Sequence, residues 1–186
     1  MRLKRHFFII CLSGLLVMQG RAQTDAPAAG RGSRNQVTLG LSFPFGVFQR
    51  SHFGGVGVDY SWTNNRRFGA GAAPKKAIGL IVQGAVDYFL GKKLKTAGYP
   101  FRYDNYLVAE VGAGMMYNPW MRTHLALTAG PLLGIYKGFT DWGYSIQLSG
   151  AYYINQRFSI GPAMVVRKFS EADALWAGAI KLSYTF

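Results

Sequence analysis

Few charges, a single cysteine and a scarcity of long apolar runs distinguish this sequence. Charged residues make up 16% of its 186 positions, whereas soluble domains carry about 25%. The hydrophobic content of 49% and the aromatic content of 15% argue against a disordered chain. The 24 glycines disfavour a helical bundle, because each glycine inside a helix costs about 1 kcal/mol relative to alanine. The length is that of one domain.

The N-terminus has the three-part layout of a secretory signal peptide. Residues 2–5 carry three basic side chains, residues 7–18 form an apolar run, and Gly20 and Ala22 are small residues at the −3 and −1 positions of a cleavage site. The apolar run is too short for a membrane-spanning helix, and no later segment approaches 18 consecutive apolar residues, which excludes a helical membrane protein. Cleavage near Ala22 would remove the only cysteine, Cys11.

Bulky apolar residues alternate with small or polar ones from residue 36 onward. Val37 and Leu39, for example, flank Thr38. A period of two predicts β-strands, so we expect no helix after this point, and the Ala/Gly/Pro/Arg-rich residues 23–35 predict a flexible lead-in. Eight segments alternate in this way, each about as long as a membrane strand of roughly 9–11 residues: 37–47, 55–62, 78–88, 107–115, 124–135, 142–152, 158–167 and 176–186.

The pattern predicts an all-β protein, an eight-stranded antiparallel up-and-down transmembrane β-barrel at residues 36–186 behind a cleavable signal peptide at 1–22. The bulky face is nearly free of charge, and the Gly, Ala, Ser and Thr of the other face suit a narrow interior. A soluble ligand-binding barrel also alternates and is the alternative. Aromatic residues at the segment ends would form two interfacial girdles: Tyr60, Trp62, Tyr117, Trp120, Tyr152, Phe158, Tyr184 and Phe186 in one, and Phe45, Phe48, Tyr88, Phe89, Tyr103, Tyr106, Tyr136, Phe139, Trp142 and Trp176 in the other.

The chain ends on a short alternating segment with apolar residues at Leu182, Tyr184 and Phe186. This ending resembles the C-terminal signature of Gram-negative outer-membrane β-barrels, and the whole pattern is similar to that of their small eight-stranded members. The resemblance implies an integral outer-membrane protein whose last strand is the signal read by the barrel-assembly machinery. It also implies that the short turns and both termini lie on the periplasmic side.

On this resemblance the connections divide between the two sides of the membrane. Tight turns at 118–121 and 155–157 would be periplasmic, and so would the connection at 63–76, which is longer than such turns usually are and holds four basic residues. The outside loops would be residues 48–53, 91–104, 137–141 and 168–173.

Five ionisable residues fall on the inward-facing side of the predicted strands, and His124 is a further candidate. Burying an unpaired charge costs several kcal/mol, so each charge should find a partner. Strand positions predict Asp87 with Arg167 toward the outside, and Asp59 with Lys181 toward the periplasm. We expect a polar plug that fills the lumen, with a gated ion path as the alternative. A general porin is not expected, because side chains fill the interior of an eight-stranded barrel and leave no aqueous channel. The network residues are Asp59, Asp87, Glu110, Arg167 and Lys181.

The second outside loop interleaves basic and aromatic residues. Such a mixture can bind nucleic acid, but an exported barrel has no ordinary access to it. Lipopolysaccharide phosphates are the better anionic partner, through charge-assisted contacts; a solvated loop without a ligand and a protein ligand are the alternatives. The candidate contacts are Lys92, Lys93, Lys95 and Arg102, beside Tyr99, Phe101 and Tyr103.

The sequence offers no convincing catalytic, metal-binding or cofactor-binding pattern. Outer-membrane deacylases of this size carry His-x-Ser on a strand, whereas His124 is followed by Leu125 and Ala126. Ser51-His52 lacks a third member for a hydrolytic site. We therefore expect a non-enzymatic protein with a structural or interaction role and no cofactor. The alternatives are a lipid-modifying barrel enzyme and an accessory barrel subunit of a secretion or conjugation apparatus.

Overall fold

The computed structural model describes residues 33–64, 77–96, 99–120, 122–155, 157–170 and 173–186. The predicted signal peptide, its cleavage site and residues 23–32 of the predicted flexible segment lie outside these ranges. The strand β1 already begins at Ser33, so residues 33–35 belong to a strand and not to the flexible segment predicted at 23–35.

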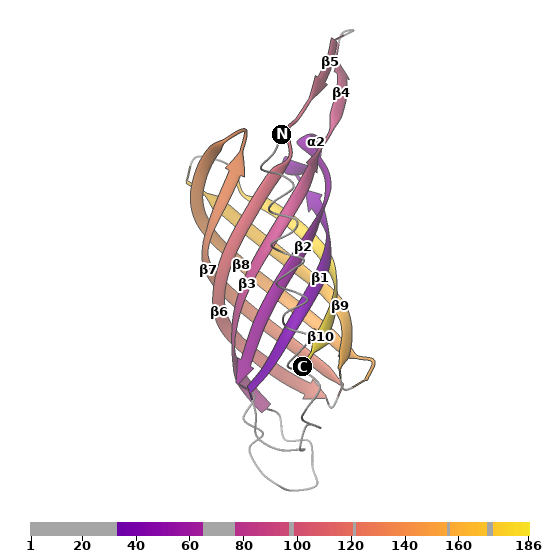
Figure 1. The fold of residues 1–186 in the computed structure, drawn as a ribbon, viewed down its shortest axis with the longest axis vertical. Helices are drawn as coiled ribbons and strands as arrows, with labels where there is room; N and C mark the ends of the chain where they lie inside the picture. The colour runs from indigo at the N-terminus through magenta and orange to yellow at the C-terminus, as the bar shows by residue number, and fades with distance from the viewer. Residues whose placement is uncertain (1–32, 65–76, 97–98, 121, 156, 171–172) are drawn as a thin grey trace, which may run out of the picture. The chain divides into compact units, whose positions relative to one another are not determined.

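Eight antiparallel strands form a closed barrel in the order β1-β10-β9-β8-β7-β6-β3-β2 (Figure 1). Successive barrel strands pair along the chain, and β1 pairs with β10, so the closed sheet has no free edge. This confirms the predicted eight-stranded up-and-down barrel. The strands have 11 to 15 residues, and all except β10 are longer than the predicted segments: β1 (Ser33–Phe45), β2 (His52–Asn64), β3 (Ala77–Gly91), β6 (Tyr106–Trp120), β7 (Thr123–Tyr136), β8 (Phe139–Tyr153), β9 (Phe158–Phe169) and β10 (Leu175–Thr185).

Side chains alternate between the outer face and the interior along the barrel strands. On β8, Ile146 and Leu148 point outward with 45% and 55% of their surface exposed, whereas Ser145 and Gln147 are buried. Large apolar side chains cover the outer face of all eight strands in the same way. Soluble monomers rarely expose an apolar surface of this extent, so the outer face is that of a transmembrane barrel.

The end of the barrel where β1 begins and β10 ends is here named the terminal end. The strand β6 continues to Trp120, which pairs with Thr123 of β7, so the predicted turn at 118–121 is wrong in its bounds. The turn predicted at 155–157 is closed by Asn155, whose Oδ1 accepts hydrogen bonds from the N–H groups of Arg157 and Phe158, both at 2.8 Å. Most of the connection predicted at 63–76, including its four basic residues, lies outside the described residues.

The opposite end of the barrel is here named the loop end. One of its loops is shorter than predicted. The loop predicted at 137–141 is only a turn of Lys137 and Gly138, because β8 already begins at Phe139. Both residues have positive φ, at 51° and 85°. Two residues of positive φ are what a tight type I′ hairpin requires.

The other two corrections at the loop end are small added elements. The loop predicted at 48–53 contains one helical turn, α2 (Phe48–Ser51), where no helix was expected. The loop predicted at 91–104 contains an antiparallel hairpin of β4 (Lys93–Thr96) and β5 (Tyr99–Arg102). No helix among the described residues is long and apolar enough to cross a membrane.

Candidate functional site in the lumen and at the loop end

The structure places all five predicted network residues inside the barrel. The five residues lie on five different strands. Each stands at a position where the alternation of side chains along its strand points into the lumen. Asp59, Asp87, Glu110 and Arg167 are buried, and Lys181 is half-buried. The strands β2, β3, β6, β9 and β10 therefore each contribute one ionic group to the lumen.

Arg167 is the centre of the larger group. Its Nε donates a hydrogen bond to Oε2 of Glu110 at 2.9 Å, and its Nη2 donates to Oε1 of Glu110 at 3.1 Å. The same Nη2 also donates to Oδ2 of Asp87. The planar guanidinium thus binds Glu110 through two parallel hydrogen bonds, the strongest geometry available to an arginine and a carboxylate.

Arg167 is only 1% exposed, and Phe89 covers it. The Phe89 ring centroid lies 5.8 Å from the Arg167 Cζ, within the range of a cation–π contact. Among the described residues, Nη1 of Arg167 has no hydrogen-bond partner. A guanidinium has five N–H donors, and the two carboxylates accept from three of them, so both donors of Nη1 are left unused.

Lys181 is the centre of the second group. Its Nζ donates hydrogen bonds to Oδ2 of Asp59 and to Oε1 of Gln147, the latter at 2.9 Å. Gln147 in turn donates from Nε2 to Oε1 of Gln83 at 3.4 Å. This chain of contacts crosses the lumen from β10 to β2, β8 and β3.

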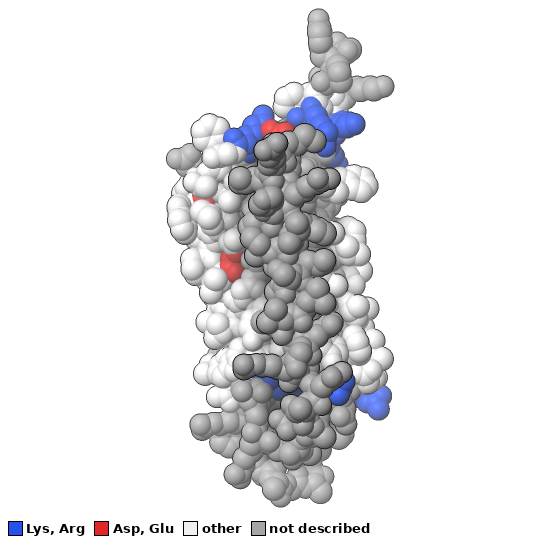
Figure 2. Space-filling view, viewed as in Figure 1, with Lys and Arg blue, Asp and Glu red and all other residues white. Residues whose placement is uncertain are grey.

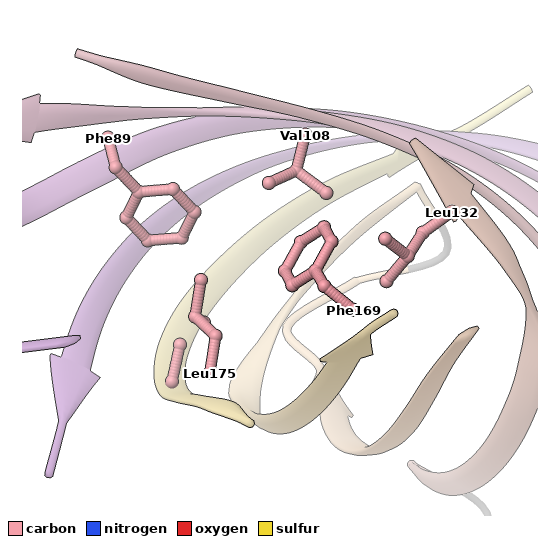
Figure 3. Close-up of a cluster of buried hydrophobic side chains, with 6 residues drawn as sticks. Phe89, Val108, Leu132, Phe169 and Leu175 are labelled. Carbon is pink, nitrogen blue, oxygen red and sulfur yellow. The ribbon is translucent and has the colours of Figure 1, made fainter. Parts of the chain in front are cut away.

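An apolar layer lies on the loop-end side of the Arg167 group, because Phe89, Val108 and Phe169 are each two residues nearer that end than the ionic residue on the same strand. The side chains drawn in Figure 3 converge inside the ring of strands, and Phe48 and Tyr106 pack against them. The girdle assignment of Phe48, Phe89 and Tyr106 was therefore wrong, because these rings belong to the interior cluster. The buried members are Phe89, Val108, Leu132, Phe169, Leu175 and Ala177.

His52 extends this layer toward the loops. Its ring stacks on Phe48 with centroids 4.1 Å apart. Nε2 of His52 lies 3.2 Å from the Asp104 carbonyl, which can only accept, so Nε2 carries the proton. The Ser51 Oγ lies 2.8 Å from Nδ1 and 3.1 Å from the Phe48 carbonyl, so two acceptors share its single proton. The sequence offered no third member for a hydrolytic site at Ser51 and His52. In the structure, the group that contacts the other ring nitrogen of His52 is the backbone carbonyl of Asp104.

His124 also lies inside the barrel, near the terminal end. It is buried against the ring of Tyr153, with centroids 5.4 Å apart, and its Nδ1 has no hydrogen-bond partner among the described residues. The described residues contain no group of three or more His, Cys, Asp or Glu side chains that could hold a metal ion.

Of the four predicted basic contacts, Lys92, Lys93 and Arg102 have described side chains, and that of Lys95 lies outside the description. Lys92 is held at the base of the β4–β5 hairpin: its N–H donates to the Ser51 carbonyl at 2.8 Å, and its Nζ donates to the carbonyl of Gln49.

Lys93 and Arg102 are exposed and lie directly opposite each other in the hairpin. Lys95 is paired with Pro100. Figure 2 shows Lys and Arg gathered at the two ends of the barrel, with a largely uncharged face between them.

The predicted assembly signal lies at the end of β10, and its last residue, Phe186, directly follows the strand. Leu182 and Phe186 are exposed on the outer face, and the Tyr184 ring lies 5.1 Å from that of Phe158. The Phe186 N–H donates to the Asn35 carbonyl at 3.0 Å, so the chain end is bound to β1. Recognition of this segment by an assembly machinery stays a prediction.

Comparison with known proteins gives matches to solved structures only. No family model matches the chain, and no curated protein matches its sequence. The crystal structure of Ail, the attachment invasion locus protein of Yersinia pestis, matches with a TM-score of 0.54 and 13% identity, covering 84% of this chain and 99% of that one.

Two further Ail structures match over similar lengths. Ail in complex with the heparin analogue sucrose octasulfate matches with a TM-score of 0.51 and 11% identity, over 83% of this chain and 99% of that one. Ail in a phospholipid bilayer nanodisc matches with a TM-score of 0.51 and 12% identity, over 83% of this chain and 100% of that one. The chain therefore has the fold of the small eight-stranded outer-membrane β-barrel proteins.

Proposed function

We propose that this protein is a non-enzymatic, integral outer-membrane barrel with a closed lumen, and that its loop end binds the phosphate groups of lipopolysaccharide. The terminal end then lies in the periplasm and the loop end outside. The chain acts as a structural or interaction protein rather than as a pore.

The pair Lys93 and Arg102 carries the binding proposal. Like charges directly opposite each other on a strand pair are destabilising, and these two cations are exposed and adjacent in register. A phosphate bound between them replaces repulsion by two charge-assisted hydrogen bonds. Lys92, fixed at the hairpin base, adds a third cation on the same loop.

The complex of Ail with sucrose octasulfate supports a polyanion ligand, because it shows a barrel of the same fold bound to a highly sulfated molecule. Lipopolysaccharide phosphates are the polyanion that an outside loop meets in the outer membrane. Phosphate binding between exposed cations also weakens with salt, since screening lengths fall to about 8 Å at physiological ionic strength.

Lipopolysaccharide binding by the purified protein tests this proposal. The double variant Lys93→Gln/Arg102→Gln should bind more weakly, and added salt should reduce binding to wild type more than to the variant. Arg157→Gln removes a cation at the opposite end and is the matched control. Dephosphorylated lipopolysaccharide should bind equally to all three proteins. Equal binding of phosphorylated lipopolysaccharide to all three would contradict the proposal.

The closed lumen has its own test. Charged groups from five strands and the apolar cluster above them occupy the interior, and they support a barrel that passes no ions. The protein in a planar lipid bilayer should show no steady conductance. Two further results would show that the protein is a folded outer-membrane barrel: different gel migration before and after boiling, and fractionation with the outer membrane. Stable open channels would contradict a closed lumen.

One observation favours the lipid-modifying alternative. Ser51 Oγ is within hydrogen-bond distance of His52 Nδ1, and the backbone carbonyl of Asp104 orients the other ring nitrogen, which is close to the geometry of a base-activated nucleophile. His52 is however only 3% exposed and stacked beneath Phe48. Profiles of membrane lipids from cells with Ser51→Ala and with wild type should be identical; loss of a lipid species in the variant would favour the enzyme.

A further inference from the structure

The outer face of β8 has a gap at Gly150. Outward positions on this strand otherwise hold large side chains, and Leu148 and Tyr152 on either side of Gly150 are 55% and 47% exposed. Gly150 pairs with Leu125 of β7. On the other side, the register with β9 places Pro162 beside it, between the pairs Ser149–Ala163 and Tyr152–Ile160.

This gap opens into a groove of about 240 Å³ near the terminal end, which extends from Pro119 at the end of β6 across β7 and β8 to β9. Leu125, Tyr152, Ile160 and Pro162 point outward and form its walls, and Gly150 lies in its floor. The groove therefore opens to the hydrocarbon that surrounds a transmembrane barrel.

Another outward glycine shows that such a gap can be filled by the protein itself. At Gly178 on β10, a Cβ would lie 3.0 Å from ring atoms of Phe45, so that ring already occupies the space. At Gly150, the nearest side-chain atom to such a Cβ is the Leu125 Cδ2 at 3.3 Å, the flexible tip of its side chain. That contact is tight as well, but it is made by a movable methyl group and not by a ring, and the groove remains open beside it.

A cation lies at the end of the groove. Arg122 is exposed in the turn between β6 and β7, and its Nη1 lies 3.5 Å from the hydroxyl of Tyr152, which lines the groove. Arg157, in the turn between β8 and β9, is also exposed at the terminal end. The described residues of these two turns carry no acidic side chain.

We propose that this groove binds one acyl chain of an anionic phospholipid of the inner leaflet, with the lipid phosphate on Arg122. An acyl chain in the groove makes dispersion contacts that an empty groove would lack, and the phosphate makes charge-assisted hydrogen bonds with the guanidinium. Assignment to the inner leaflet rests on the proposed function, which places the terminal end in the periplasm. Lipopolysaccharide, in the other leaflet, would meet the opposite end.

Lipid retention in native mass spectrometry tests the site. Detergent-solubilised full-length protein is mixed with phosphatidylglycerol or with zwitterionic phosphatidylcholine, and the fraction that retains one lipid is measured. Wild type should retain phosphatidylglycerol preferentially. Gly150→Leu, which fills the groove, should lose the retained lipid. Ala129→Leu is the control, because it adds the same side chain to another exposed outward position of the same sheet. Arg122→Gln should lose the preference for phosphatidylglycerol.

Retention that is equal in wild type, Gly150→Leu and Ala129→Leu would overturn the proposal, provided that gel migration before and after boiling shows folded barrels. Retention of lipid A in place of phosphatidylglycerol by the Gly150 groove would also overturn it. Arg157→Cys in a mature chain without other cysteines separates the two proposals. Labelling of this cysteine in intact cells by a bulky maleimide would overturn the orientation, and with it the leaflet. If the cysteine is protected but Gly150→Leu retains as much lipid as wild type, the orientation stands and only the lipid site is overturned.

Discussion

Asp87 of β3 lies directly opposite Gly57 of β2, and its carboxylate fills the space that a side chain at residue 57 would need. A Cβ at this position would collide with Oδ1 of Asp87. We expect Gly57→Ala to displace the carboxylate from Arg167 and to lower the free energy of unfolding by about 1–3 kcal/mol, the usual cost of overpacking. Urea titration of tryptophan fluorescence in lipid vesicles measures this loss.

Gly40→Ala is the matched control for Gly57→Ala. Gly40 also faces the lumen, but its Cβ would make only ordinary contacts, the nearest to Lys181 Cγ at 3.7 Å. Equal stability of the two variants would show that the Gly57 site does not position Asp87.

Removal of Arg167 should be strongly destabilising. Arg167→Met leaves two buried carboxylates without their cation, and breaking a buried ion pair in this way costs about 3–5 kcal/mol. Adding Asp87→Asn and Glu110→Gln to Arg167→Met removes the uncompensated charges and should restore part of the loss. Unfolding midpoints in urea for the single and triple variants give the comparison. A triple variant that is less stable than Arg167→Met would contradict this electrostatic explanation.

The apolar layer should contribute more per residue than the outer face. Phe89 is fully buried, so Phe89→Ala leaves a cavity and should lower the free energy of unfolding by about 3–5 kcal/mol. Phe43→Ala, at a position that is 49% exposed on the outer face, should cost less. The same urea titration applies, and a larger loss for Phe43→Ala would place the main packing energy of the barrel outside the lumen.

Two substitutions in the turn between β7 and β8 should change the stability of the barrel in opposite directions. Gly138 has φ of 85°, so Gly138→Ala should destabilise the barrel by about 1–2 kcal/mol. Lys137 has φ of 51°, and Lys137→Asn supplies a residue that tolerates this region better, so it should be stabilising. The thermal midpoint of heat-modifiable gel migration is a convenient readout. The same direction of change in both variants would argue against the type I′ geometry.

The barrel could be predicted because its physical cause is local. Alternation along each strand sets which face meets lipid, and eight alternating segments leave few other architectures. The ionic groups on inward positions could be found for the same reason. The sequence could not predict that Glu110 binds Arg167 together with Asp87, because this contact depends on how far each side chain extends across the lumen.

Three features had signals that were weak or misread. Tyr88 and Phe89 are adjacent at a strand end, and only strict parity reveals that Phe89 points inward like Asp87. The β4–β5 hairpin has strands of four residues, too short for alternation to be recognised. The groove over Gly150 depends on how side chains from β7, β8 and β9 lie beside one another, which is a property of the assembled sheet.

The interior contacts join parts of the chain that are far apart in sequence. Lys181 and Asp59 are separated by 122 positions, and Arg167 and Asp87 by 80. The Asp59–Lys181 contact needs β1 to pair with β10, and Arg167 of β9 reaches Asp87 of β3 only when the sheet has curved into a barrel. We therefore expect early intermediates to carry these charges without their partners. Insertion of a half-built barrel into hydrocarbon is thereby penalised, and the favourable energy of the network arrives together with closure of β1 on β10. Biogenesis of this chain should accordingly be all-or-none, with few stable partly inserted forms.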